Sequence, residues 1–202
     1  MVRQAKIHRI TRETEISAKL IIEGTGHTAV ETPIGFLNHL LETLTFHGRF
    51  NLEFFAKGDL QVDQHHLVED CGLVLGQVMR KAAGQGHGLN RVGFFIMPMD
   101  DSLAITAVDL SGRPYLQFEL RTRRRFCGEL DTDLLEEFFQ ALARGLMANI
   151  VIKVAGGKND HHKLEAVFKS LGRSLRYALA MDPRESENIS ELLPTLKGVI
   201  DL

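Results

Sequence analysis

The pattern His-His-x-x-Glu occurs twice in this chain of 202 residues, at 65–69 and at 161–165, which are matching places in its two halves. Imidazole nitrogens and carboxylate oxygens on one short segment are ligands that divalent transition metals accept. If each motif opens a helix, the histidine and the glutamate four residues later lie on one face. The repeat therefore predicts two metal ions, with candidate ligands at His65, His66, Glu69, His161, His162 and Glu165.

Adjacent histidines cannot easily share an ion on a helix. Their side chains point about 100° apart, since a helix has about 3.6 residues per turn. We therefore expect His65 and His66 to serve different ions, and His161 and His162 likewise. Each ion would then collect ligands from both halves of the fold or from neighbouring chains.

The segments before the two motifs follow the same order. Residues 36–44 carry apolar side chains at helical spacing, and an apolar strand at 50–55 and a turn follow. Residues 134–142, 150–154 and 156–160 repeat the order helix, strand, turn. In this internal alignment Glu137 is the counterpart of His39, so both become candidate metal ligands.

The rest of the chain completes an α+β pattern. Residues 1–33 alternate and predict two antiparallel strands with a turn at 23–26, and 91–99, 102–109 and 113–120 predict further strands. Long helices are expected at 66–83 and 161–181, and glycines at 84–88 mark a boundary. We predict an α+β, internally duplicated two-lobe fold with helices packed between two mixed β-sheets. The lobes are 1–88 and 89–182, followed by a tail at 183–202, in one integrated catalytic unit.

Composition excludes several classes of protein. Apolar content of 44% and charged content of 25% are ordinary for a globular chain, and the net charge of −2 indicates neither nucleic acid nor an anionic membrane. The run of arginines within 121–125 is typical of a solvated strand end or loop. Two cysteines form no disulfide framework, which favours a reduced, cytoplasmic setting. No apolar run reaches the roughly 18 residues of a membrane span.

Three cations are candidates for binding a phosphate group. Arginine forks match phosphate oxygens in a bidentate way. Arg91 follows the glycine-rich boundary, Arg113 follows Ser111 and Gly112, and Lys197 lies beside Gly198. His47 ends a predicted helix, where a histidine can either join a site or interact with the helix dipole.

Four stretches, 35–39, 63–70, 109–114 and 157–166, closely resemble the imidazoleglycerol-phosphate dehydratases of histidine biosynthesis. The resemblance runs from residue 12 to residue 198. It implies a manganese enzyme with two Mn²⁺ ions per active site that converts imidazole-glycerol phosphate to imidazole-acetol phosphate. It also implies four helices between two sheets, and a homo-oligomeric shell of 24 chains built from trimers, with metal sites between chains.

The resemblance further assigns roles to single residues. Metal ligands are implied at His39, His65, His66, Glu69, His161, His162 and Glu165. Substrate contacts are implied at Glu13, His47, Arg91, Arg113, Lys169, Thr195 and Lys197. Glu13 is the candidate acid–base group, and Lys169 the candidate hydrogen-bond donor to a substrate hydroxyl.

This dehydration needs another way to stabilise negative charge, because the substrate has no carbonyl group that would stabilise a carbanion. We hypothesise that a metal-bound imidazolate expels the neighbouring hydroxyl to give a diazafulvene, which loses a proton to become an enol and then the ketone. One alternative is a two-metal hydrolase of a phosphorylated small molecule, with ions about 3.5–4 Å apart. Another is a non-catalytic protein that assembles on metal.

Overall fold

The computed structural model describes residues 2–182, so Thr195, Lys197 and the tail lie outside the described residues. The first half of the chain forms a four-stranded sheet with two helices. The strands in spatial order are β1 (Gln4–Ile10), β2 (Thr14–Ile21), β4 (Asn51–Gly58) and β3 (Thr28–Glu31). The helices are α1 (Gly35–Gly48), before β4, and α2 (His65–Ala83), after it.

The second half repeats this arrangement. Its strands in spatial order are β5 (Val92–Met99), β6 (Ser102–Asp109), β10 (Asn149–Gly156) and β7 (Tyr115–Glu119). Its helices are α3 (Leu134–Leu146) and α4 (Asp160–Leu179), and a small hairpin adds β8 (Phe126–Cys127) and β9 (Leu130–Asp131). In both sheets the third strand of the chain runs parallel to its neighbour and the other pairs are antiparallel, so both sheets are mixed.

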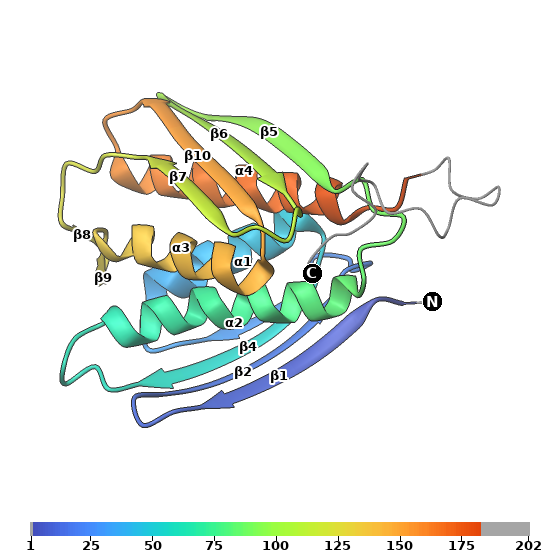
Figure 1. Ribbon diagram of the computed structural model, residues 1–202. Coiled ribbons are helices and arrows are strands. Elements are labelled where there is room, and N and C mark those ends of the chain that lie inside the picture. Colours follow the sequence, from blue (N-terminus) through green and yellow to red (C-terminus); the bar gives the residue numbers. More distant parts are fainter. Residues whose placement is uncertain (1, 183–202) are drawn as a thin grey trace.

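Four helices lie between the two sheets, as Figure 1 shows. Helix α2 packs on the first sheet and α4 on the second, while α1 packs beside α4 and α3 beside α2. The apolar face of β2, with Ile16, Ala18 and Leu20, is fully buried against this helical layer. The predicted α+β class, with helices between two mixed sheets, is confirmed.

Glycines set how closely the paired helices approach. A Cβ atom on Gly172 of α4 would overlap the carbonyl oxygen of Leu44 in α1. A Cβ atom on Gly72 of α2 would overlap the carbonyl oxygen of Phe138 in α3 in the same way. Interiors packed this tightly do not accept an added methyl group without displacement of the backbone. The close α1–α4 contact is what brings residues of α1 next to the second histidine motif.

The prediction that a turn at residues 23–26 joins two antiparallel strands is wrong. The reversal lies at residues 11–13, where the Thr11 hydroxyl accepts hydrogen bonds from the backbone N–H groups of Glu13 (3.1 Å) and Thr14 (2.9 Å). Residues 22–27 instead connect β2 to the third strand, β3. The first 33 residues therefore contain three strands. The sequence did not signal the reversal at 11–13, because a threonine side chain closes this turn without glycine or proline.

Candidate metal centre

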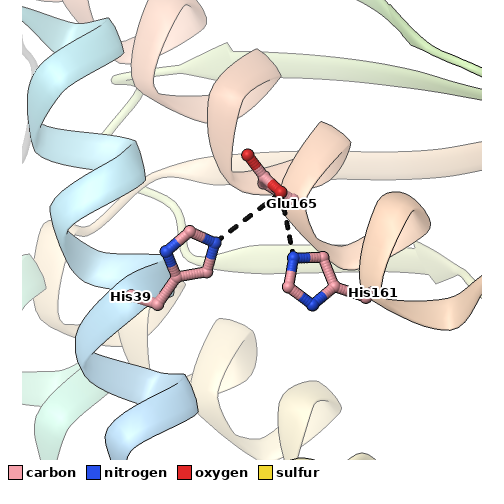
Figure 2. Close-up of side chains that lie close together, drawn as sticks. All are labelled: His39, His161 and Glu165. Atoms are coloured by element: carbon pink, nitrogen blue, oxygen red, sulfur yellow. Dashed lines mark hydrogen bonds and ion pairs between the residues drawn. The ribbon is translucent and has the colours of Figure 1, made fainter.

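Three of the predicted ligands converge between α1 and α4. The Nε2 atom of His161 lies 3.1 Å from a carboxylate oxygen of Glu165, and the Nε2 atom of His39 lies 3.6 Å from the same oxygen. Figure 2 shows the three side chains pointing toward one another, with His39 from α1 and the other two from α4. One ligand atom from each residue lies within 4.8 Å of the other two. This arrangement suits a single divalent cation.

The electrostatics of the cluster also fit a cation. The Nε2 atom of His39 is buried and has no hydrogen-bond partner within residues 2–182. Burial alone would raise the pKa of Glu165, but the hydrogen bond from Lys169 and the nearby histidines bring the pKa below its ordinary value. Glu165 is therefore ionised at neutral pH. An ionised carboxylate with two imidazoles and no thiol is a donor set that suits Mn, Zn, Fe or Ni.

The two histidines of each motif face different groups. The rings of His65 and His66 stand at 89° to each other with centroids 6.1 Å apart, and those of His161 and His162 stand at 88°, 6.2 Å apart. Since helix geometry sends neighbouring side chains in different directions, the pairs cannot close on one point from one chain. Their assignment to different ions stays a prediction.

The first motif forms a less complete ligand set. His65 lies 3.6 Å from Glu69 on α2, and Arg144 of α3 donates to the other oxygen of Glu69. No third ligand joins these two within the described residues, where the only three-ligand group is that of His39, His161 and Glu165. Glu137 therefore belongs to no ligand group in the described part of one chain, and its predicted role as a ligand stays a prediction.

His66 is oriented by a carboxylate that the sequence did not single out. Its Nδ1 atom lies 3.1 Å from Asp59, and its Nε2 atom faces Glu13 at 3.8 Å. The hydrogen bond to Asp59 is the main reason that the pKa of His66 is raised above its ordinary value. A carboxylate on one ring nitrogen is the usual way in which proteins orient a metal-binding histidine. The Nε2 atom is thereby directed outward, toward the candidate acid–base group.

His162 has a similar neighbour. Its Nδ1 atom lies 3.2 Å from a carboxylate oxygen of Asp100, in the turn between β5 and β6, although the two atoms are not aligned as a hydrogen bond. Both second histidines thus have an aspartate beside Nδ1. Neither aspartate was predicted, since each lies in a turn whose position relative to the motif is fixed only by the folded chain.

Two predicted substrate contacts lie beside the ligands of α1 and α4. A cleft of about 380 Å³ is lined by His47 and Lys169 together with His39 and Glu165. The Lys169 ammonium donates to Glu165 at 2.8 Å. Partial burial, and then the charges of Lys169 and Arg173, hold the pKa of His47 below its ordinary value, although Glu165 opposes this. His47 is therefore neutral at physiological pH and able to accept or donate a hydrogen bond.

The predicted phosphate-binding arginines lie elsewhere on the chain. Arg91 forms a bidentate pair with Asp109 (2.7 and 3.1 Å), and the strand register places Arg113 at the same end of the second sheet, next to the opposite edge strand. The Arg91 N–H donates to the carbonyl of Ala178, seventeen residues beyond His161 on α4. At about 1.5 Å per helical residue, Arg91 lies about 20–25 Å along α4 from Glu165 and His161 of the same chain.

A buried ion pair fixes the start of α4. Asp160 and Lys163 are 4% and 5% exposed and lie 2.9 Å apart. The Asp160 carboxylate also accepts hydrogen bonds from the backbone N–H groups of Arg123 and Arg124, and Lys163 donates to the carbonyl of Arg121. The arginine-rich segment is a loop, as predicted. Sequence reasoning missed that its backbone is fastened to the helix that carries His161.

We expect Asp160→Asn to lower the free energy of unfolding by about 3–5 kcal/mol, because Lys163 would remain buried without its partner. Burial alone would raise the pKa of Asp160, but its hydrogen bonds from Lys163 and the two backbone N–H groups bring the pKa below its ordinary value. Because the pKa is lower in the folded state, the Asp160 carboxylate stabilises the fold at pH values above its unfolded pKa of about 3.9. This stabilisation is lost as the pH falls through the folded pKa. Urea titrations at pH 7 and pH 3.5 measure this loss. In the double variant Asp160→Asn/Lys163→Met, the free energy of unfolding should fall less between pH 7 and pH 3.5 than in the unmodified chain. An equal fall in the two proteins would contradict the stabilising role of the Asp160–Lys163 pair.

The duplicated halves and the paired histidine helices are typical of an α+β enzyme with a candidate metal centre between parallel helices. The model of the imidazoleglycerol-phosphate dehydratase family matches residues 32–175. A dehydratase of this name from Lachnoclostridium phytofermentans is 45% identical over 100% of both chains, and one from Koribacter versatilis is 44% identical over 98% of this chain and 100% of the relative. The chain belongs to the imidazoleglycerol-phosphate dehydratase family, and its reaction class is that of a hydro-lyase.

Solved structures agree with this family assignment. The crystal structure of the Pyrococcus furiosus enzyme superposes with a TM-score of 0.80 at 35% identity, covering 96% of this chain and all of that one. The Staphylococcus aureus enzyme superposes with a TM-score of 0.79 at 34% identity, covering 89% and 99%. Within the described residues, no helix is both long and apolar enough to cross a membrane.

Proposed function

We propose that this chain converts imidazole-glycerol phosphate to imidazole-acetol phosphate in histidine biosynthesis, with two Mn²⁺ ions at each active site. The observation that carries the proposal is the convergence of His39, His161 and Glu165 in a chain of this family. The relatives that match over their full length bear the name of this dehydratase. Family membership favours this reaction over a two-metal hydrolase and over a protein that only assembles on metal.

The two histidines of each motif would hold different ions, and each ion would collect ligands from both halves of the fold or from neighbouring chains. His39, His161 and Glu165 are the donors that fit one cation, while His65, His66, His162 and Glu69 are the proposed donors to ions shared with another chain. When bound, divalent cations supply Lewis acidity that stabilises negative charge on the nitrogen ring of the substrate.

Protein side chains carry the proton transfers in this proposal. The Glu13 carboxylate, 3.8 Å from His66, would accept the ring N–H proton and pass it to the hydroxyl, which departs as water. It would then accept the C–H proton from the neighbouring carbon and return it to the product as the enol becomes the ketone. The Lys169 ammonium hydrogen-bonds a substrate hydroxyl and keeps Glu165 ionised. His47 lines the same cleft and contacts the substrate as a neutral imidazole.

The phosphate arginines imply more than one chain per site. Arg91 lies about 20–25 Å from the metal ligands of α4 along the helix, and Arg113 lies at the same end of the second sheet. The imidazole and phosphate of one small substrate, in contrast, are separated by a few bonds of about 1.5 Å. We therefore propose that the arginines of one copy complete the metal site of another, in the 24-chain shell expected from the family. We further propose a cytoplasmic location, which suits the two buried, unpaired cysteines.

The proposal is tested by assaying the dehydration with and without metal. EDTA should abolish formation of the ketone, and Mn²⁺ should restore it, while inorganic phosphate is not released at any stage. Release of phosphate would support the hydrolase instead. Assembly on Mn²⁺ without any turnover, followed by sedimentation, would support the non-catalytic alternative.

A further inference from the structure

Three arginines converge on a second cleft, at the carboxyl ends of α1 and α4. Arg49 directly follows α1, and Arg173 and Arg176 lie in the last two turns of α4. The cleft has a volume of about 480 Å³ and adjoins the cleft of the metal ligands, since Phe46 and His47 line both. Gly24 and Thr25 complete its wall.

No carboxylate offsets these charges within residues 2–182. Other arginines of the described chain, such as Arg3 and Arg144, are paired with glutamates. Arg173 instead lies over the ring of Phe95, 4.9 Å from its centroid, a contact that leaves its positive charge in place. Partial burial, and then the charges of Arg49 and Arg173, lower the pKa of Arg176. The three guanidinium groups are thus crowded closely enough to repel one another.

Helix ends provide the simplest competing explanation. Cations in the last turn of a helix interact favourably with its dipole, by about 0.3–1 kcal/mol each. The internal repeat offers a direct comparison, because α2 and α3 form an equivalent pair. There the counterparts of Arg49, Arg173 and Arg176 are Met147, Gln77 and Arg80. The last turns of α2 and α3 also carry Lys81 and Arg144, but Arg144 is paired with Glu69 and Lys81 donates to the carbonyl of Lys6. The equivalent helix ends therefore do not gather three cations without a carboxylate partner.

The backbone conformation at Arg49 does not explain why an arginine occupies this position. Arg49 and Met147 both cap their helices in the left-handed region, with φ of 54° and 57°. Glycine or asparagine usually fills such a position, so both halves accept a strained cap. The conformation is common to the two halves, whereas the charge is not, because Arg49 lines the second cleft and Met147 is uncharged.

We propose that Arg49, Arg173 and Arg176 form a binding site for a phosphate dianion, separate from Arg91 and Arg113 at the end of the second sheet. The planar fork of a guanidinium group matches two phosphate oxygens, and such charge-assisted hydrogen bonds are short and strong. A dianion would offset most of the repulsion among three monocations. The volume accommodates either inorganic phosphate or a small phosphate monoester, which present the same oxygens.

The experiment measures binding of inorganic phosphate and of glycerol 3-phosphate by calorimetry at constant ionic strength. All proteins carry Arg113→Gln, so that the proposed substrate phosphate site contributes little. On this background Arg49→Gln/Arg176→Gln is compared with Arg80→Gln, which removes a cation from the equivalent turn of α2. Each lost charge-assisted hydrogen bond should weaken binding by roughly tenfold or more, because about 1.4 kcal/mol corresponds to tenfold.

Binding that falls at least about 100-fold in the double variant, but not in Arg80→Gln, supports the site. Comparison of the two anions then distinguishes a site for free phosphate from one that accepts monoesters. Equal affinity in both variants would overturn the proposal. Unchanged affinity with an altered sedimentation coefficient would also overturn it, and would assign the arginines to a contact between copies. None of these binding results tests the proposed dehydration, which depends on other residues.

Discussion

Glu165→Gln is expected to weaken Mn²⁺ binding by more than about 100-fold and to abolish dehydration with it. Removing even an outer hydrogen-bond partner of a ligand costs about 10–100-fold in metal affinity, and Glu165 supplies the only negative charge of its cluster. Its carboxylate, whose side chain is 14% exposed, lies between His39 and His161. The neutral amide would also leave the nearby Lys169 cation without its counter-ion.

Calorimetric titration with Mn²⁺ measures the affinity, and circular dichroism verifies the fold. The matched control is Glu42→Gln, because Glu42 lines the same cleft without belonging to the ligand group. Wild-type Mn²⁺ affinity in Glu165→Gln would refute the proposed centre.

A second variant separates ligation from simple charge neutralisation. Lys169→Met removes the ammonium that donates to Glu165 at 2.8 Å. If Glu165 is a metal ligand, loss of this competing cation leaves Mn²⁺ affinity unchanged or tighter, while the turnover number falls. Weaker Mn²⁺ binding in Lys169→Met would instead indicate that Lys169 and Glu165 act only as a structural pair.

Local features of this fold were predictable from sequence. The helices over 134–142 and 161–181 follow from the spacing of apolar residues, since one buried stripe repeats every 3.6 residues. The repeated motif predicted the duplication because both copies sit after the same helix, strand and turn. Each of these inferences used neighbours within about thirty residues of the chain.

Contacts between distant segments were not predictable in this way. The partner of Glu69 is Arg144, 75 residues away, and the Asp160 carboxylate holds the backbone N–H of Arg123, 37 residues away. The side chains of α2 and α3 meet only after the two halves have packed together, so no spacing in the sequence encodes such pairs. The error over residues 23–26 has a different cause. A glycine-rich segment is a strong local signal, whereas the true reversal depends on one threonine hydroxyl.

The last prediction concerns Glu13, which the turn between β1 and β2 presents to the first motif. The Asp59 N–H donates to the carbonyl of Glu13 at 3.1 Å, while the Asp59 carboxylate holds His66. One loop thus fixes both the candidate acid–base group and the histidine beside it. The Glu13 side chain is 53% exposed, so it is accessible to a substrate that enters from solvent or from a neighbouring copy.

Glu13→Gln is therefore expected to lower kcat by about 10²–10⁴-fold, the usual contribution of a positioned acid–base group. Mn²⁺ affinity should change by less than about threefold, a difference of under 1 kcal/mol, because the amide still fits beside His66. Glu15→Gln is the matched control, since Glu15 lies two residues away and pairs with His8 at 3.3 Å. Wild-type kcat in Glu13→Gln would exclude proton transfer by this carboxylate. A parallel loss of Mn²⁺ affinity would reassign Glu13 as a metal ligand. The pH–rate profile distinguishes the two roles, because one limb of the profile disappears only when the replaced residue is an acid–base group.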